Sequence, residues 1–245
     1  MGRTQVLGIG FDPVTMSGAL AKLESYVNIG KPHLVITANP EMVMRARGDQ
    51  LLAEIMDRAD LVVADGIGVV WASSVISQKV PERIPGIELA EGLLEKAAQA
   101  GWKVFLLGGA EGVSDRAAKS LKERLPSLQI VGTHHGFFKP GLEEEAVIAS
   151  IKQAKPDILL AALGVPRQEK WLAAHLGVLK VPVAIGVGGS FNVWAGVDKR
   201  APRWVRNIHL EWLYRLVRQP WRIKRMTLLP IFAFTVLGAR LRQGR

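Results

Sequence analysis

Cysteine is absent from the 245-residue chain. Without cysteine the protein can form no disulfide framework, no thiolate metal site and no thiol nucleophile. A reducing compartment is permitted by the same absence. Any catalytic group must therefore be sought among oxygen and nitrogen side chains.

Long apolar runs are also lacking. No stretch reaches the ~20 consecutive apolar residues that a membrane-spanning helix needs. The longest uncharged candidate, Met226 to Ala239, is shorter and contains Pro230. We expect this run to lie on a membrane or dip into it without crossing. The first residues, Met1 to Gln5, lack the apolar region of a secretory signal.

Acidic residues are nearly missing from the last fifth of the chain. From Lys199 to Arg245, twelve of the 32 Lys and Arg residues accompany one acid, Glu211. The formal net charge of +10 divides into +11 for this tail and −1 for everything before it. The tail also contains three of the seven tryptophans. A near-neutral body with a basic, apolar tail is typical of proteins that act at a membrane surface.

The residues before the tail alternate short apolar runs with amphipathic ones. This alternation predicts one α/β domain over residues 1–198, with a Rossmann-like, mostly parallel sheet and helices on both faces. Residues 199–245 are expected to form a helical, basic C-terminal appendage. We predict a helix over Gly86 to Ala100 and strands over Gln5 to Ile9, His33 to Thr37, Leu61 to Ala64, Lys103 to Leu107, Gln129 to Gly132, Asp157 to Leu163 and Val181 to Val187.

Polar and glycine residues follow nearly every predicted strand. Because parallel sheets bind ligands beyond the carboxyl ends of their strands, these residues should converge on one rim. Glycines there allow close backbone approach, and helix N-termini supply N–H donors for an anion. The segments begin at Thr37, Asp65, Gly108, His134, Gly164 and Gly186.

Two of these positions have both a chemical and a structural interpretation. Asp65 follows an apolar run, and a carboxylate at a strand tip can take a proton from a substrate hydroxyl. It could instead cap a helix that starts near Ile67. Asn39 stands before Pro40, an arrangement that also favours a helix N-cap.

The glycine turns and basic loop residues could bind phosphate, but each has a simpler interpretation. Gly108-Gly109 and Gly188-Gly189-Ser190 could cradle a phosphate or ribose, or simply form tight turns. Neither matches the dinucleotide fingerprint or the P-loop, which weighs against an NAD-type oxidoreductase and an NTPase. Arg83 and Arg167 stand in Gly/Pro-rich loops, where an arginine can bind phosphate or remain a solvated surface residue.

A metal site is not indicated. His134 and His135 would point to opposite faces of a strand. There is no H-E-x-x-H motif and no Asp-x-Asp pair to hold Mg²⁺ against a nucleotide diphosphate. We expect a reaction that needs no metal and no cofactor.

Several motifs occur in an order that is known from one family. They are Thr37-Ala38-Asn39-Pro40-Glu41, Asp65-Gly66, Pro81-Glu82-Arg83-Ile84-Pro85-Gly86, Gly132-Thr133-His134-His135-Gly136, Leu163 to Trp171, Gly186 to Phe191, Lys199-Arg200-Ala201-Pro202 and Glu211 to Arg215. On these motifs the chain resembles the WecG/TagA/CpsF glycosyltransferases along nearly its whole length. The branch of N-acetylmannosaminyltransferases that make the wall teichoic acid linkage unit looks closest.

The resemblance implies an inverting, metal-independent transfer of N-acetylmannosamine from its UDP donor. The acceptor would be the 4-hydroxyl of N-acetylglucosamine on undecaprenyl diphosphate. Asp65 would be the general base, with Thr37, Asn39, Arg83 and Gln168 orienting donor and acceptor. The expected nucleotide-sugar contacts are Gly108, Gly109, Gly164, Gly188, Gly189, Ser190 and Asn192.

Two positions depart from the pattern expected for this family. Asn192 and Glu88 each stand where many members have aspartate. Both departures leave the donor open, because the broader family also uses the uronic acid of N-acetylmannosamine and other UDP-hexoses.

The tail is expected to be amphipathic. Trp204, Ile208, Trp212 and Leu216 recur at four-residue spacing and predict one face of a helix from Arg203 to Arg218. In the resembled family a C-terminal appendage recognises the lipid-linked diphosphate, which implies that role for Arg215, Arg222 and Arg225. The alternative is a terminal helix packed on the body with a solvated basic face.

A nucleic-acid-binding protein is the alternative from a different class, because basic tails also bind phosphate backbones. Phe232, Phe234 and the neighbouring aliphatic residues suit acyl chains better. We therefore expect a cytoplasmic protein on the inner face of the bacterial membrane, with a UDP-sugar, a lipid-linked acceptor and the membrane surface as partners. Oligomeric state stays open, since an apolar tail can also pack on a second subunit.

Overall fold

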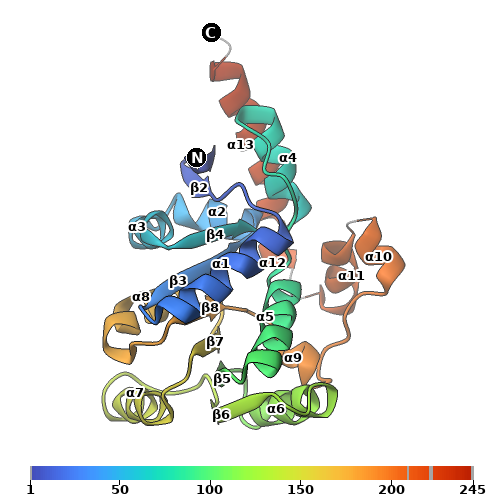
Figure 1. The fold of residues 1–245 in the computed structure, drawn as a ribbon. Helices are drawn as coiled ribbons and strands as arrows, with labels where there is room; N and C mark the ends of the chain where they lie inside the picture. Colours follow the sequence, from blue (N-terminus) through green and yellow to red (C-terminus); the bar gives the residue numbers. More distant parts are fainter. Residues whose placement is uncertain (1, 209, 221–222, 244–245) are drawn as a thin grey trace.

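The computed structural model describes residues 2–208, 210–220 and 223–243. Figure 1 shows a central sheet with helices on both faces, as the alternating pattern predicts. All paired strands of this six-stranded sheet are parallel, in the order β4-β3-β8-β7-β5-β6. These strands are β3 (His33–Ala38), β4 (Leu61–Ala64), β5 (Lys103–Gly108), β6 (Gln129–His134), β7 (Ile158–Ala162) and β8 (Val183–Gly186).

The predicted first strand is wrong. Two short strands, β1 (Thr4–Val6) and β2 (Ile9–Phe11), pair antiparallel in a separate hairpin. Leu7 and Gly8, which join them, have φ angles of 51° and 89°. Two consecutive residues with positive φ match the twist of a two-residue hairpin, so the chain reverses where one strand was expected.

The helices divide between the two faces of the sheet. One buried cluster joins the sheet to α2 (Pro40–Ala46), α3 (Gln50–Arg58), α4 (Ile67–Ile76), α7 (Leu142–Ala154) and α8 (Arg167–Leu179). The other joins it to α1 (Met16–Ile29), α5 (Gly86–Ala100), α6 (Val113–Arg124) and α9 (Ser190–Trp194). The predicted helix from Gly86 to Ala100 is confirmed.

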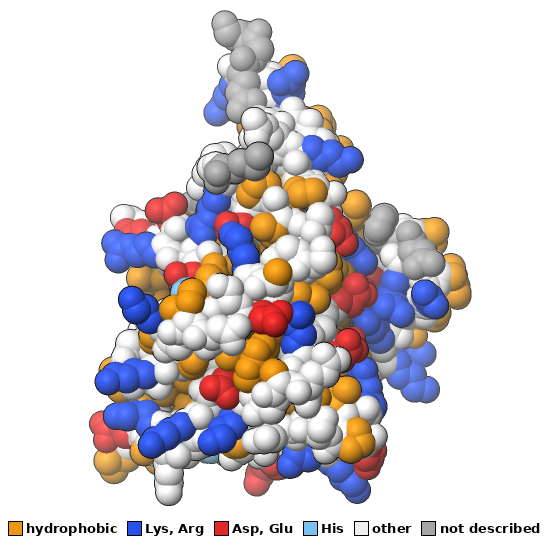
Figure 2. Space-filling model, viewed as in Figure 1, with side chains coloured by type: hydrophobic (Ala, Val, Ile, Leu, Met, Phe, Trp, Pro, Cys, Tyr) orange, Lys and Arg blue, Asp and Glu red, His pale blue; other side chains and the backbone are white. Residues whose placement is uncertain are grey.

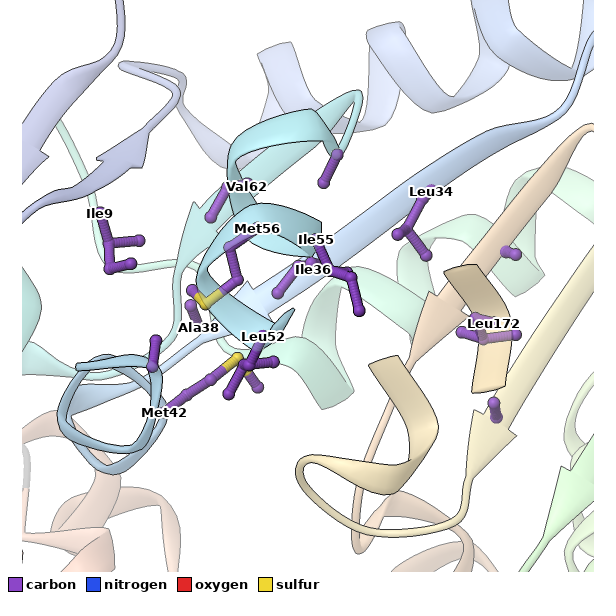
Figure 3. Close-up of a cluster of buried hydrophobic side chains, with 14 of the residues drawn as sticks. Ile9, Leu34, Ile36, Ala38, Met42, Leu52, Ile55, Met56, Val62 and Leu172 are labelled. Atoms are coloured by element: carbon purple, nitrogen blue, oxygen red, sulfur yellow. The ribbon is translucent and has the colours of Figure 1, made fainter. Parts of the chain in front are cut away.

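Figure 3 shows part of the first cluster. Strand side chains meet two short helices and α8 here, and each of the larger ones is almost fully buried. Burying a side chain of this size contributes about 1.5–3 kcal/mol, which fixes α2 and α3 over the carboxyl half of β3. The labelled side chains are Ile9, Leu34, Ile36, Ala38, Met42, Leu52, Ile55, Met56, Val62 and Leu172.

The chain order creates a switch point between β3 and β8. Strand β3 leads to α2 and α3 on one face, whereas its neighbour β8 leads to α9 on the other. Connections that leave adjacent strands toward opposite faces open a crevice at their carboxyl ends, where doubly wound folds bind ligands.

The tail is helical but not one continuous helix. The predicted helix from Arg203 to Arg218 is wrong: α10 (Arg203–Asn207) and α11 (Glu211–Arg218) are separate. Val205 is buried, and Arg206 pairs with Glu88 of α5 at 3.2 Å, so α10 is held against the body. These contacts orient α10 separately from the helix that follows.

Two further helices, α12 (Ile223–Met226) and α13 (Leu228–Gln243), complete the described tail. The run that starts at Met226 therefore forms most of α13, which lies beside α4 in Figure 1. Phe232 and Val236 are buried, whereas Phe234 is 75% exposed. Within the described residues no helix is long and apolar enough to cross a membrane.

Candidate active site

Thr37, near the end of β3, and Gln168, in the first turn of α8, both contact Gly186 at the switch point. The Thr37 hydroxyl donates to the carbonyl oxygen of Gly186, at the tip of β8, at 3.3 Å. The Gln168 side chain lies over the same glycine, since a Cβ on Gly186 would be 2.6 Å from Gln168 Nε2. Both side chains are buried. The structure thus brings together two predicted site residues that are far apart in sequence.

Asn39 and Asp65 lie next to each other on the β3–β4 side of the crevice. The backbone N–H of Asp65 donates to the Ala38 carbonyl at 2.9 Å. A Cβ on Gly66 would be 4.0 Å from Asn39 Cβ. Both polar side chains are half-buried at adjacent strand tips.

The capping alternatives for these two residues have different outcomes. The N-cap interpretation of Asn39 is confirmed, because its Oδ1 accepts from the Met42 N–H at 3.0 Å. The capping hydrogen bond uses the side-chain oxygen of Asn39, so Nδ2 is the side-chain atom of Asn39 that can reach a ligand. The N-cap interpretation of Asp65 is wrong: Gly66 occupies that position, and α4 has no side-chain cap.

The loop that carries Arg83 runs back along the end of β4. The N–H of the next residue, Ile84, donates to the Ala64 carbonyl at 2.8 Å. The loop leads directly into α5, whose first residue, Gly86, touches Thr37; a Cβ there would be 2.7 Å from the hydroxyl oxygen. The half-buried Arg83 is thereby placed on the Asp65 side of the crevice.

The two diglycine turns differ in how much space surrounds them. Gly108 is tightly packed, since a Cβ would be 2.4 Å from the Ala162 carbonyl oxygen. Gly109 donates to that oxygen at 3.0 Å and accepts from the Gly136 N–H at 2.8 Å. The Gly108-Gly109 turn therefore joins three strand ends and uses its backbone groups to do so.

The second turn is open. In the described part of the chain no atom lies within 4 Å of a Cβ built on Gly164, Gly188 or Gly189. The backbone that follows the carboxyl ends of β7 and β8 therefore has free space beside it, as a ligand site needs. Ser190 is buried and donates to the Val187 carbonyl at 2.7 Å.

Asn192 faces the tail. Its Nδ2 lies 3.4 Å from Asp198 Oδ2, and Asp198 also accepts from Gln219 Nε2 at 2.7 Å. Asn192 thus contacts Asp198, whereas Gly188 donates its N–H to Gln168.

Helix N-termini supply the positive character of this rim. In α1, α2 and α3 a side chain caps the first turn. No side-chain cap is formed at α5 or at α4, α6, α7, α8 and α9, which directly follow β4, β5, β6, β7 and β8. Uncapped N–H groups beside an open crevice favour an anionic ligand.

Two other sequence candidates serve structure. Arg167 donates to the carbonyls of Gly136 and Phe138 at 2.8 and 3.2 Å, which fixes the loop after β6. His135 lies beyond the end of β6, so the two histidine rings are 4.4 Å apart and do not point to opposite faces. Among the residues that the structure describes, no group of three or more His, Asp or Glu side chains is placed to hold a metal ion.

A cavity of about 460 Å³ lies beside this rim on the α7–α8 side. Phe137, Phe138 and Trp171 supply its apolar lining, with Arg167 at its edge. None of the residues predicted for transfer lines it. We therefore place the candidate site at the β3–β8 crevice.

The predicted lipid-diphosphate residues lie in the tail. The side chains of Arg215 in α11 and Arg225 in α12 lie outside the described part of the structure, as does Arg222 entirely. Their role stays a prediction. Helix α10, which precedes these arginines, contacts α5 through the Arg206–Glu88 pair. Helix α13, which follows them, packs on α2 and α4.

Three features of the structure were not expected from the sequence. Glu88, noted only as a departure, pairs with both Arg200 and Arg206. Phe232 packs on the body through Gly68. Glu169, the third residue of α8, is 2% exposed.

The parallel sheet and its switch point define a doubly wound α/β protein, a class that binds ligands at the carboxyl ends of its strands. The chain belongs to the WecG/TagA/CpsF family of glycosyl transferases, whose family model matches residues 4–245. It is 38% identical over 240 residues to proteins of Staphylococcus aureus strains MW2 and NCTC 8325, covering 97% of this chain and 93% of theirs. Both are named N-acetylglucosaminyldiphosphoundecaprenol N-acetyl-beta-D-mannosaminyltransferase.

Proposed function

We propose that this protein transfers N-acetylmannosamine from UDP-N-acetylmannosamine to N-acetylglucosaminyl-diphospho-undecaprenol, as a step of wall teichoic acid linkage-unit synthesis. The observation that carries the proposal is the extent of the match to the two named transferases. It covers 97% of this chain, so it includes the tail as well as the crevice. A shared catalytic fold alone would not have required the tail to align.

Asp65 is the general base in this proposal. The acceptor 4-hydroxyl gives its proton to the Asp65 carboxylate while its oxygen attacks the anomeric carbon. The bond from that carbon to the diphosphate oxygen breaks, and its electron pair leaves with UDP. Attack opposite the leaving group inverts the anomeric centre. The position of Asp65 at a strand tip, half-buried beside Asn39, supports this role.

The donor is bound across the switch point. Thr37 and Gln168 line it from the β3 and β8 sides, with the Asn39 Nδ2 donor and the Arg83 guanidinium on the Asp65 side. The open turns at Gly164 and at Gly188 to Ser190 provide room for the nucleotide. Uncapped helix N–H groups and Arg83 offset the charge that develops on the leaving diphosphate, in place of a metal ion.

Two predicted donor contacts receive less support from the geometry. Gly108 and Gly109 are packed into the sheet and use their backbone groups there. Asn192 contacts Asp198. We assign these three residues to the wall of the donor site, and assign direct nucleotide contacts to Gly164, Gly188, Gly189 and Ser190.

The tail supplies the acceptor side. The tail is anchored at one end by the ion pair between Arg206 of α10 and Glu88, in the first turn of α5, where Gly86 touches Thr37. It is anchored at the other end by Phe232 of α13, which packs against Gly68 in the first turn of α4, just beyond Asp65. In the sequence, the segment between these two anchors carries Arg215, Arg222 and Arg225. We propose that these arginines bind the acceptor diphosphate.

The membrane contact is proposed for the same appendage, residues 199–245. Trp204, Val217 and Phe234 are 68%, 74% and 75% exposed. Figure 2 shows Lys and Arg side chains beside apolar ones on the lobe formed by α10 and α11. Basic and apolar groups together can bind the headgroup region of an anionic bilayer, and this supports our proposal that the enzyme is peripheral on the inner face of the cell membrane.

The donor identity is supported by where the two sequence departures lie. Glu88 pairs with Arg200 and Arg206, and Asn192 contacts Asp198. Both side chains thus contact residues at the root of the appendage. We infer that these departures adjust tail packing and leave the sugar specificity unchanged.

The decisive test is a donor screen with the purified protein and lipid-diphosphate N-acetylglucosamine, following UDP release. UDP-N-acetylmannosamine is expected to give the fastest release, ahead of its uronic acid and of UDP-N-acetylglucosamine. Faster release with either of those two donors would transfer the assignment to that sugar. Omission of the acceptor is the control, because donor hydrolysis also releases UDP.

Binding to anionic liposomes and to duplex RNA or DNA tests the class itself. Liposome binding that weakens with Trp204→Ser and Phe234→Ser is expected. Salt-sensitive duplex binding without liposome binding would instead favour the nucleic-acid alternative.

A further inference from the structure

Glu169, the third residue of α8, is a carboxylate almost completely removed from solvent. It is 2% exposed. A glutamate at this helix position commonly accepts from the backbone N–H of the N-cap residue. Here the N-cap is Pro166, which has no N–H. In the described part of the chain, Glu169 Oε2 has no hydrogen-bond partner. Helix capping therefore does not explain why this buried carboxylate is present.

The other carboxylate oxygen holds the side chain of Gln168. Glu169 Oε1 accepts from Gln168 Nε2 at 2.7 Å, and Gln168 Oε1 accepts from the Gly188 N–H at 3.2 Å. A carboxylate only accepts and a backbone N–H only donates, so one orientation of the amide satisfies both neighbours. Glu169 thereby determines which end of Gln168 faces the open turn.

We propose that Glu169 is a positioning residue for the nucleoside-diphosphate-sugar donor: it orients the Gln168 amide and, through it, the turn from Gly188 to Ser190. This inference rests on the proposed function, which places the donor at that turn. Gln168 has little freedom to compensate, because its amide lies 2.6 Å from where a Gly186 Cβ would be. An inverted amide would bring two N–H donors together at Gly188.

Two acidic side chains on the neighbouring helices contact α8 without reaching Glu169. Asp49, at the start of α3, pairs with Lys170 at 2.6 Å. Glu144 of α7 accepts from Trp171 Nε1 at 2.8 Å and lies 3.3 Å from His175 Nε2. None of these contacts supplies a countercharge to Glu169.

The strands beneath α8 supply no countercharge either. The segments β7 and β8 contain no titratable residue. Strand β3 contains only His33, which is stacked on Tyr26 at the opposite, amino end. On α8 itself Arg167 donates to the carbonyls after β6. Burial without a countercharge raises the pKa of Glu169 to about 7.

Ionisation of Glu169 has opposite effects on the site and on the fold. The ionised form accepts from Gln168 in a charge-assisted hydrogen bond, so the amide is held firmly. Protonation removes that charge, which loosens the amide and the Gly188 turn. A buried charge without a partner nevertheless costs stability. Neutralising Glu169 should therefore weaken donor binding while stabilising the protein, a combination that a purely structural role would not produce.

The experiment measures UDP binding by calorimetry between pH 5.5 and 8.5, together with the thermal midpoint, for wild type, Glu169→Leu and Glu169→Gln. Glu169→Leu is expected to weaken UDP binding at pH 8 by about five- to tenfold and to raise the midpoint. Wild-type affinity is expected to fall by about the same factor from pH 8 to pH 6. The terminal phosphate of UDP titrates near 6, so the wild-type profile is compared with that of Glu169→Gln, which should lack the Glu169 contribution.

Glu144→Gln is the matched control, since it removes a carboxylate that contacts α8 through Trp171 and His175 and not through Gln168 or Glu169; UDP affinity should be unchanged. Glu169→Asp retains a buried charge but is too short for Gln168, so it should weaken binding without stabilising. Wild-type affinity in Glu169→Leu, or in Glu169→Gln a pH profile equal to that of wild type, would overturn the inference. If Glu169→Leu does not fold, the Glu169→Gln profile decides. Failure of wild type itself to bind UDP would contradict the proposed function instead.

Discussion

The ring of Phe232 in α13 lies against Gly68 in the first turn of α4. A Cβ on Gly68 would be 3.9 Å from Phe232 Cε1 and 2.8 Å from Pro40 Cγ of α2. The C-terminal helix therefore packs where the helices that follow Asn39 and Asp65 begin. This contact joins the end of the chain to the candidate site.

Phe232→Ala should release α13 from the body. Phe232 is 2% exposed, and truncating a buried phenylalanine costs about 3 kcal/mol. We expect faster amide hydrogen exchange in α4 and α13 and reduced transfer to the lipid-linked acceptor, with UDP binding retained. Phe234→Ala is the matched control, because Phe234 is 75% exposed and its loss should leave exchange unchanged. Equal rates of amide exchange in the two variants would argue against the packing role.

Asp65→Ala should abolish transfer while UDP still binds. A single base is worth about 10²–10⁴-fold in rate, so turnover should fall by that factor. UDP release with saturating lipid acceptor measures the rate, and calorimetry measures UDP binding. Asp57→Ala, at an exposed position on α3, controls for the loss of an aspartate. Near-normal turnover of Asp65→Ala would remove Asp65 as the base.

Glu88→Ala should detach α10 from α5. It leaves Arg200 and Arg206 without their shared carboxylate, although Arg200 keeps a longer contact with Glu91 at 3.8 Å. We expect faster tryptic cleavage within residues 199–218 and slower turnover of the lipid acceptor. Glu95→Ala, on the exposed side of the same helix, should leave the cleavage rate unchanged. Cleavage of Glu88→Ala at the wild-type rate would show that apolar contacts hold α10.

The stability of the fold should depend on pH through Glu169. Burial raises the pKa of Glu169 from 4.5 to about 7, so the folded state binds a proton that the unfolded state has released in this range. Its contribution is present below pH 4.5 and is lost as pH rises through about 7. The shift corresponds to about 3 kcal/mol at pH 8. Denaturant unfolding of wild type and Glu169→Gln at pH 4.5 and 8 should show a difference that grows with pH; a constant difference would contradict it.

Turnover should not need a divalent metal ion. The residues proposed to stabilise the leaving diphosphate are N–H donors and Arg83, not carboxylates. Adding EDTA or Mg²⁺ to the standard assay should therefore change UDP release by less than about twofold, since the charge is offset by fixed donors. Loss of turnover with EDTA and its recovery with Mg²⁺ would replace this part of the mechanism.

Deletion of the whole appendage should affect the stability of the body as well as its activity. From the sequence we expect deletion from Lys199 onward to leave a folded body that no longer uses lipid-linked acceptor. Ala201, Val205, Phe232 and Val236 are buried, so this deletion also exposes apolar surface on the body. Lower stability is therefore expected along with the lost activity, and retained full activity would make the appendage incidental.

The sequence by itself determined the layered fold and the positions of the strand tips. Alternating apolar runs are a local property, and a parallel sheet follows from them because each crossover helix must cover a face. The same logic placed Thr37, Asp65, Gln168 and Gly188 on one rim. It failed at Gln5 to Ile9, where positive φ angles at Leu7 and Gly8 reverse the chain.

Only the tertiary structure decided which rim residues touch and what the tail packs against. The order β4-β3-β8-β7 puts Thr37 beside Gly186. In α8, Glu169 is buried against Gln168, and its Oε2 has no hydrogen-bond partner among the described residues. Such contacts depend on strand order and on burial, which act between residues distant in sequence. The same is true of the tail: its charge was evident from composition, but its attachment through Glu88 and Gly68 required the packed body.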